Sequence, residues 1–125
     1  MLKMLLSISP EHVNNILCGS KQVEFRKVKC RHEIKQIIIY STAPVMQVVA
    51  EALVEEVITG DILDVWRLTK AYAGISYSYY RKYYKGKKNA VAYKLSEVMP
   101  YSEPKTLADF GVSHAPQSFL YVAST

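Results

Sequence analysis

Cysteine is scarce in this chain of 125 residues, which contains only Cys18 and Cys30. The two cysteines stand twelve positions apart, and the sequence has no Cys-x-x-Cys pair and no His-x-x-x-His segment that could complete a zinc site. The three histidines, His12, His32 and His114, are scattered as well. We therefore expect reduced structural thiols, no bound metal and no cofactor.

Long apolar runs are also missing. No segment approaches the 18 or more consecutive apolar residues that a membrane helix needs. The start, MLKMLLSISP, is only briefly apolar and lacks a small-residue cleavage site after it, so we expect a cytoplasmic protein. Because the chain also lacks internal repeats and a Pro/Gly/Ser-rich linker, we expect one domain over residues 1–125, a length sufficient for a hydrophobic core.

Acidic residues are few, 11 against 16 Lys and Arg, and the resulting charge of +5 is unevenly distributed. Residues 20–35 hold six basic and two acidic residues, and residues 79–88 hold five basic residues and no acidic one. Such concentration favours a polyanionic partner, because each neutralised phosphate releases counterions. Two exposed loops made basic for solubility are the alternative.

Local patterns predict the order of the elements. Three capping residues, Ser9 before Pro10, Asp61 and Ser76, mark helices that end at Gly19, at residues 73–75 and at Gly86. Apolar alternation and β-branched runs predict strands over residues 5–9, 22–26, 36–42, 45–59, 89–101 and 118–123, with a helical turn at 107–111. Residues 45–59 could form either one long strand or a bent pair of strands. The few, grouped helices favour an α+β fold, an antiparallel or mixed β-barrel with flanking α-helices.

Several segments together resemble the ASCH domain family, whose fold is PUA-like. They are LLSISPEHVNNILCGSKQVEFRK, IIIYSTAPVMQVVAE, the helix with Leu63 and Trp66, YYKGKKNAVAYKL and PQSFLYV. The resemblance runs from Leu5 to Val122 and suggests a small bacterial or phage-type single-domain member. It implies a small β-barrel with a cleft beside the strand that carries Lys, Glu and Arg, and it implies RNA binding. Some small relatives are amidohydrolases that act on 4-acetylcytidine.

The resemblance singles out Lys21, Glu24 and Arg26, in the pattern Gly-x-Lys-x-x-Glu-x-Arg. Glu24 and Arg26 share one face of the expected strand, because alternate side chains point to the same side. Lysine could contact a phosphate or act as nucleophile or base, glutamate could accept from an exocyclic amino group or move a proton, and arginine could stack on a base. A solvated lysine and a structural Glu/Arg pair are the alternatives.

Further nucleic-acid contacts are expected around this cleft. The hydroxyl groups at the end of the expected strand over residues 36–42 could donate to a base or phosphate, although Ser and Thr at such positions often satisfy their own turn. Either Glu51 or Glu55 could face the same cleft. Gln117 could also look into it. The remaining candidates are Lys27, Tyr40, Ser41 and Thr42.

The segment YSYYRKYYKGKK, residues 77–88, mixes tyrosines with cations, as nucleic-acid-binding segments do. Helical spacing, however, predicts that the pairs Tyr79/Tyr83 and Tyr80/Tyr84 form a stripe packed on the sheet, as Trp66 is expected to be. The cations off that stripe are candidate phosphate contacts: Arg81, Lys82, Lys85, Lys87 and Lys88.

Three functions remain open from the sequence. The first is an RNA-binding module whose basic cleft takes an ordinary or a modified nucleotide. The second is an amidohydrolase acting on an acylated nucleoside such as 4-acetylcytidine through Lys21 and Glu24; the amidohydrolase relatives carry threonine at the position of Glu24, and this difference leaves catalysis undecided. The third is a transcription-related regulatory or protein-interaction module that would contact a protein or DNA through the Tyr/Lys helix.

Overall fold

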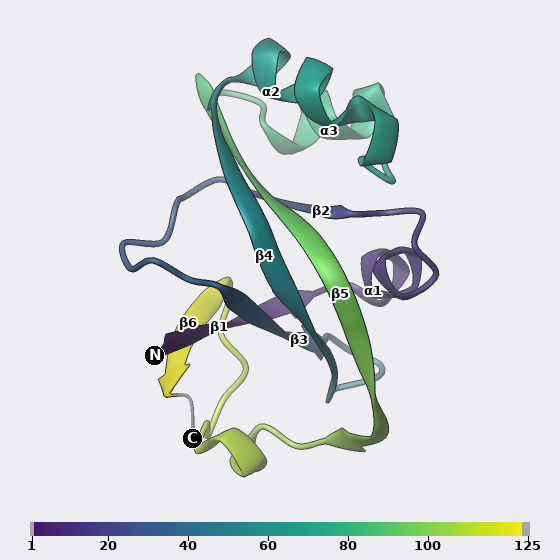
Figure 1. Ribbon diagram of the computed structural model, residues 1–125, viewed down its shortest axis with the longest axis vertical. Helices are drawn as coiled ribbons and strands as arrows, with labels where there is room; N and C mark the ends of the chain where they lie inside the picture. The colour runs from purple at the N-terminus through teal and green to yellow at the C-terminus, as the bar shows by residue number, and fades with distance from the viewer. Residues whose placement is uncertain (1, 124–125) are drawn as a thin grey trace.

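The computed structural model describes residues 2–123, and within them six strands form one sheet in the order β2-β5-β4-β3-β1-β6 (Figure 1). Met1, Ser124 and Thr125 belong to the expected domain but lie outside the described residues. The elements are β1 Leu2–Ile8, α1 Pro10–Leu17, β2 Val23–Arg26, β3 Gln36–Ser41, β4 Gln47–Asp61, α2 Ile62–Thr69, η1 Lys70–Tyr72, α3 Tyr77–Tyr83, β5 Asn89–Lys105, η2 Ala108–Phe110 and β6 Phe119–Ala123.

The sheet is mixed. β1 and β3 pair in parallel, whereas the β1–β6, β2–β5, β3–β4 and β4–β5 pairs are antiparallel. The α+β class is therefore confirmed, but the barrel is not, because the edge strands β2 and β6 form no ladder with each other over residues 2–123. A side chain bridges the gap instead: Nη2 of Arg26, at the end of β2, donates to the carbonyl of Ser118, just before β6, at 2.7 Å.

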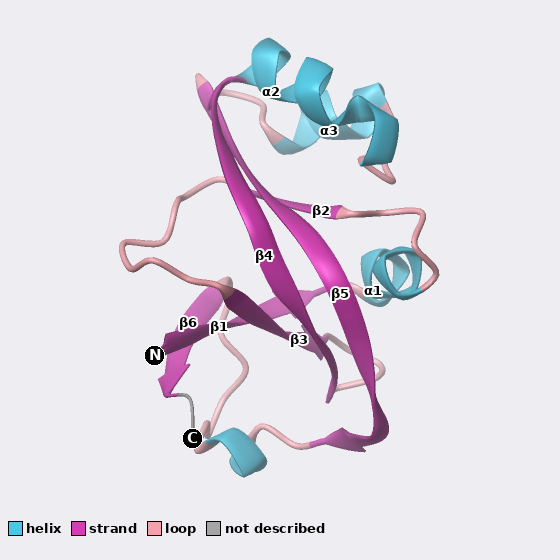
Figure 2. Ribbon diagram, in the orientation of Figure 1, coloured by secondary structure: helices cyan, strands magenta, loops and turns pink. Residues whose placement is uncertain are grey.

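The helices begin where the sequence predicts (Figure 2). The Asp61 carboxylate accepts from the backbone N–H of Leu63 and of Asp64, and the Ser76 hydroxyl accepts from the N–H of Tyr79. Ser9 precedes α1 in extended conformation but makes no capping bond with its side chain, and Pro10 fixes the first helical residue. No helix of residues 2–123 is both long and apolar enough to cross a membrane.

The helices pack at two places on the sheet. Val13 and Ile16 of α1 join one core cluster with the inner residues of β1 and β3, such as Leu6 and Ile39. α2 and α3 lie together at the far end of the long β4–β5 hairpin (Figure 1). There Tyr80 and Tyr84 are buried against Val23 and Phe25 of β2 and against strand β5, with Trp66 packed partly buried on the same cluster.

Differences from the prediction occur mainly at the ends of elements. β4 is one strand with register shifts, β5 continues to Lys105, four residues past its expected end, and α3 stops at Tyr83. Only half of the tyrosine stripe is core: Tyr80 and Tyr84 are buried, whereas Tyr79 is 46% exposed. The two pairs are offset by 100° around the helix, which turns Tyr79 and Tyr83 to the edge of the packed face.

Candidate functional site

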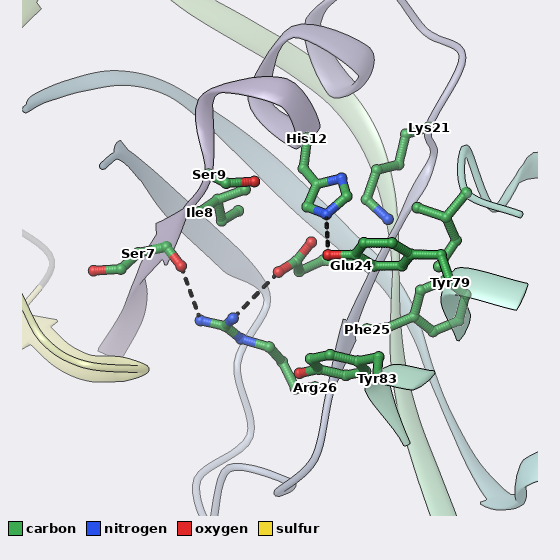
Figure 3. Close-up of a pocket in the computed structure, with 11 residues that line it drawn as sticks. Ser7, Ile8, Ser9, His12, Lys21, Glu24, Phe25, Arg26, Tyr79 and Tyr83 are labelled. Carbon is green, nitrogen blue, oxygen red and sulfur yellow. Dashed lines mark hydrogen bonds and ion pairs between the residues drawn. The ribbon is translucent and has the colours of Figure 1, made fainter. Parts of the chain in front are cut away.

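A pocket of about 80 Å³ lies between the end of β1, the start of α1, β2 and α3 (Figure 3). That volume is several times the minimum that one water requires, so the pocket has room for a small planar group. Its lining residues are Ser7, Ile8, Ser9, His12, Lys21, Glu24, Phe25, Arg26, Ile75, Tyr79 and Tyr83. The structure thus brings the three residues singled out by the family resemblance into one concave site.

Lys21 is buried, with 2% of its surface exposed, and its Nζ donates to the carbonyl of Ala73 at 3.2 Å. The same ammonium group lies 5.0 Å from the centre of the Phe25 ring. Burial lowers the pKa of Lys21 because it penalises the charged form, and the nearby Glu24 carboxylate partly opposes this effect. The amine is therefore easier to deprotonate than an ordinary lysine.

Gly74 allows the chain to hold Lys21 in this position. Its φ is +67°, and a Cβ built on it would lie 2.3 Å from Cβ of Lys21 and 2.7 Å from Cα of the same residue. Only glycine fits so close an approach in a left-handed conformation. A backbone bond from the N–H of Gln22 to the carbonyl of Tyr72, at 2.9 Å, fastens the same loop to the start of β2.

Glu24 and Arg26 form an ion pair of 3.4 Å between Oε2 and Nη1, with both side chains largely buried. Nη2 of Arg26 also donates to the carbonyls of Ser7, at 3.3 Å, and Ser118, at 2.7 Å. Figure 3 shows the guanidinium held between Ser7 and Glu24. Oε1 of Glu24 has no hydrogen-bond or ion-pair partner within residues 2–123, so this oxygen is free to accept from a ligand.

His12 and Tyr79 close the pocket from the two helices. Nε2 of His12 lies 2.9 Å from the Tyr79 hydroxyl, and the rings meet edge to face. Burial and the neighbouring Lys21 lower the pKa of His12, against weaker opposing effects of Glu24 and Glu11, so the neutral imidazole is favoured at pH 7. Sequence reasoning did not place His12 in the site, since nothing in its spacing links it to Lys21.

Tyr83 adds an aromatic wall next to a cation. Its hydroxyl pKa is raised, chiefly by burial, and Arg26 opposes the shift. Nζ of the exposed Lys27 lies 4.8 Å from the centre of the Tyr83 ring, at the side of the pocket. The i, i+4 spacing of Tyr79 and Tyr83, distinct from that of Tyr80 and Tyr84, is the pattern that could have indicated a second aromatic face.

Comparisons with known proteins bear on the fold and the family of the chain. No family model matches the chain. An ASCH domain-containing ribonuclease of Zymomonas mobilis is 33% identical over 97 residues, which are 77% of this chain and 66% of that protein. The crystal structure of ASCH from Zymomonas mobilis has a TM-score of 0.87 and 29% identity, covering 97% of this chain and 87% of that chain. The chain belongs to the ASCH domain family.

Two longer proteins of Ureaplasma parvum contain a similar segment. ATP synthase subunit alpha and large ribosomal subunit protein uL22 are 28% and 29% identical to the chain over 120 residues, or 95% of it. The chain spans only 15% and 39% of their lengths. The segment that is similar to this chain is therefore a minor part of each of these two proteins.

The other predicted residues of the ASCH domain lie outside the pocket. Tyr40 is buried in the core beside Leu5 and Val48. Ser41 is buried with its hydroxyl unpartnered among the described residues, and the backbone N–H of Thr42 donates to Ile8. None of these three lines the pocket, because the end of β3 pairs with the backbone of β1 there.

Three further residues that were expected near the cleft also lie outside the pocket: Glu51, Glu55 and Gln117. Glu51 accepts from the Gln36 amide at 3.2 Å and from the Tyr101 hydroxyl at 3.0 Å. Glu55 pairs with Lys94 at 3.7 Å. Gln117 is exposed, and none of the three residues lines the pocket.

The five cations of the second basic segment are exposed, and none of them lines the pocket. Arg81 and Lys82 lie on α3, and Lys85, Lys87 and Lys88 follow in the turn before β5. The cysteines are free, Cys18 exposed and Cys30 buried. Residues 2–123 hold no group of three His, Cys, Asp or Glu side chains placed to bind a metal.

Proposed function

We propose that the domain binds single-stranded RNA and that the pocket receives one nucleotide of the strand. The observation that carries the proposal is the convergence of a buried lysine, a buried glutamate with a free oxygen, and two tyrosine rings on one hollow. The relative named as a ribonuclease supports RNA as the polymer. Single-stranded RNA offers unstacked bases, which proteins recognise by stacking and by hydrogen bonds to the base edges.

Each side chain would have a distinct task in this complex. Oε1 of Glu24 would accept from an amino or imino N–H of the base, while Nζ of Lys21 would donate to a ring nitrogen or carbonyl oxygen. Tyr79 and Tyr83 would contact the base with their rings. Arg26 is engaged with Ser7, Ser118 and Glu24, so it would hold Glu24 in place and would not itself stack on the base.

The test is RNA binding by Lys21→Met, which keeps most of the apolar stem and removes the ammonium group. Since a hydrogen bond to a charged group contributes about 1.5–3 kcal/mol, we expect affinity for a short oligonucleotide to fall roughly 10- to 100-fold. Fluorescence anisotropy of a labelled oligonucleotide measures this loss. Lys35→Met removes one exposed charge outside the pocket and is the matched control.

Equal affinities of the two variants would rule out the pocket as the nucleotide site. A thermal melt of both proteins shows whether Lys21→Met is folded. Glu24→Gln, which keeps the shape of the side chain, gives a second variant if the first is unstable. A modified base in the RNA is tested in the same assay by comparing cytidine with 4-acetylcytidine at one position.

Hydrolysis of an acylated nucleoside is the second candidate, favoured by the lowered pKa of Lys21 beside Glu24. An amine with a lowered pKa is a better nucleophile or base at neutral pH. Purified protein in excess over 4-acetylcytidine should then release cytidine and acetate, detectable by chromatography, and Lys21→Met should abolish the release. Absence of product under these conditions would eliminate this substrate, while cleavage of an RNA chain in a parallel assay would assign the activity of the named relative to this site.

An interaction module that uses the α3 tyrosines has less support. Tyr80 and Tyr84 are buried and hydrogen-bonded to backbone carbonyls, which leaves only Tyr77 and Tyr79 broadly exposed on the helix. We also propose that residues 1–125 form one domain that acts in the cytoplasm. DNA is the competing polymer in the binding assay, and preference for it would redirect the proposal to a DNA-binding module.

A further inference from the structure

A second hollow lies on the other side of α3 from the pocket. It is an open groove between the start of α2, α3 and the turn that leads into β5. Four of its lining residues are basic, Arg81, Lys85, Lys87 and Lys88, and one is acidic, Asp61. The Asp61 carboxylate caps α2 through the N–H groups of residues 63 and 64, so it is already engaged at the groove wall.

Within the part of the chain that the structure describes, the four cations form no ion pair with an acidic side chain. The ion pairs within residues 2–123 are Arg26–Glu24 and Lys94–Glu55, and neither involves the groove. Arg81 instead contacts Tyr77, with Nη1 3.2 Å from the hydroxyl. Four like charges around one groove repel each other, and this repulsion is relieved when a polyanion binds.

The groove and the pocket share α3 as a common wall. Tyr79 and Tyr83 line the pocket, and Tyr80 points into the core. Arg81 lines the groove together with the buried Tyr84, which follows the last residue of α3. At 100° per residue, Arg81 lies on the opposite flank of the helix from Tyr79. A strand that occupies both hollows must therefore cross the exposed side of α3, where Lys82 lies exposed.

The distance between the two hollows sets the length of such a strand. Tyr83, at the pocket, and Lys87, at the groove, are four residues apart in the sequence. Their Cα atoms are therefore separated by at most about 14 Å, the span of four extended residues. A stacked single strand that rises about 3.4 Å per nucleotide crosses this distance in about four nucleotides.

We propose that the groove binds the phosphate backbone of the same RNA strand whose nucleotide enters the pocket, so that full affinity requires about six to eight nucleotides. This inference rests on the proposed RNA binding. Base contacts in the pocket supply selectivity, and phosphate contacts in the groove supply salt-dependent affinity. An oligonucleotide of three residues fills the pocket alone.

The experiment measures the affinity of three-, five- and eight-residue RNAs at several salt concentrations by fluorescence anisotropy. The groove variant carries Arg81→Gln, Lys85→Gln, Lys87→Gln and Lys88→Gln. The control variant carries Lys29→Gln, Arg31→Gln, Lys35→Gln and Lys70→Gln, four exposed cations outside both hollows, so the two variants have the same net charge.

We expect the wild-type protein and the control variant to bind the eight-residue RNA at least 10-fold more tightly than the three-residue RNA. The groove variant should lose this gain but keep the wild-type affinity for the three-residue RNA. The slope of log affinity against log salt concentration should be smaller in magnitude by up to about 3, since each phosphate contact to a single strand contributes about 0.7. An unchanged length dependence in the groove variant, or an equal loss in the control variant, overturns the inference while RNA binding stands. A wild-type protein that binds no RNA of any length overturns the proposed function itself.

Discussion

The two basic segments have similar charge in the sequence, but only the first brings any of its cations into the interior of the fold. In residues 20–35, Lys21 is buried and Arg26 is partly buried, and both donate to backbone carbonyls, so these two cations organise a pocket, while the other four are exposed. In residues 79–88 all five cations are exposed. A buried charge shapes a site and is costly to remove, whereas an exposed charge mainly attracts counter-charge. Position in the fold, more than the number of charges, decides what each segment can do.

The largest difference between the two segments is expected in the stabilities of the variants Arg26→Met and Arg81→Met. Removing Arg26 leaves Glu24 as a buried, unpaired carboxylate and leaves the Ser7 and Ser118 carbonyls short of a donor. We expect the free energy of unfolding to fall by about 3–5 kcal/mol, the usual cost of breaking a buried ion pair. Urea denaturation measures it. Arg81→Met should leave stability nearly unchanged, and similar losses in both variants would refute the contrast.

A smaller effect is expected from Gly74→Ala against Gly86→Ala. Both glycines have positive φ, +67° and +81°, but an added Cβ at Gly74 would clash with Lys21, while nothing lies within 4 Å at Gly86. The shared backbone strain costs about 1–2 kcal/mol, and the clash should add about 1–3 kcal/mol at Gly74 only. Thermal and urea unfolding of the two variants give the difference. If Gly86→Ala is the more destabilised protein, the packing assigned to Lys21 is wrong.

The smallest effect concerns pH. Because the folded state lowers the pKa of Lys21 from 10.5, the neutral amine is reached at a lower pH in the fold than in the unfolded chain. Stability from this group is then fully present above pH 10.5 and is lost as pH falls through the lowered pKa. RNA binding should change the other way, weakening by up to about 10-fold as the ammonium group deprotonates. Lys21→Met should lack this step in a binding series from pH 7 upward; persistence of the step would assign it to another group.

Much of the secondary structure was predictable because the capping residues and the strand patterns lie in, or directly beside, the elements that they determine. Asp61 and Ser76 cap the helices that follow them, and the β-branched run of residues 36–41 is a central strand. The barrel was not confirmed because closure depends on whether β2 and β6 pair, and alternation within a strand does not determine its neighbour. The positions of Glu51 and Glu55 likewise depend on the β4–β5 register, with its shifts.

The candidate site was predictable in part. Lys21, Glu24 and Arg26 lie within six residues of each other, so one strand and its approach are enough to gather them. His12 and Tyr79 reach the pocket from two helices that are 67 positions apart in the sequence. Their contact depends on how α1 and α3 pack around β2, which no local pattern specifies. Tyr40 is buried because its face of β3 packs into a core cluster with Leu5 and Val48.

The carbonyl of Ser118 accepts two hydrogen bonds, from Arg26 at 2.7 Å and from the backbone N–H of Ser7 at 3.1 Å. Arg26 also forms the ion pair with Glu24, so the first of these hydrogen bonds connects the residue before β6 to the position of Glu24. Neither Ser118 nor any residue of β6 lines the pocket. The residue before β6 therefore helps to fix the Glu24 side chain from outside the pocket. Substitutions that shift the backbone at Ser118 should therefore also disturb the geometry of Glu24.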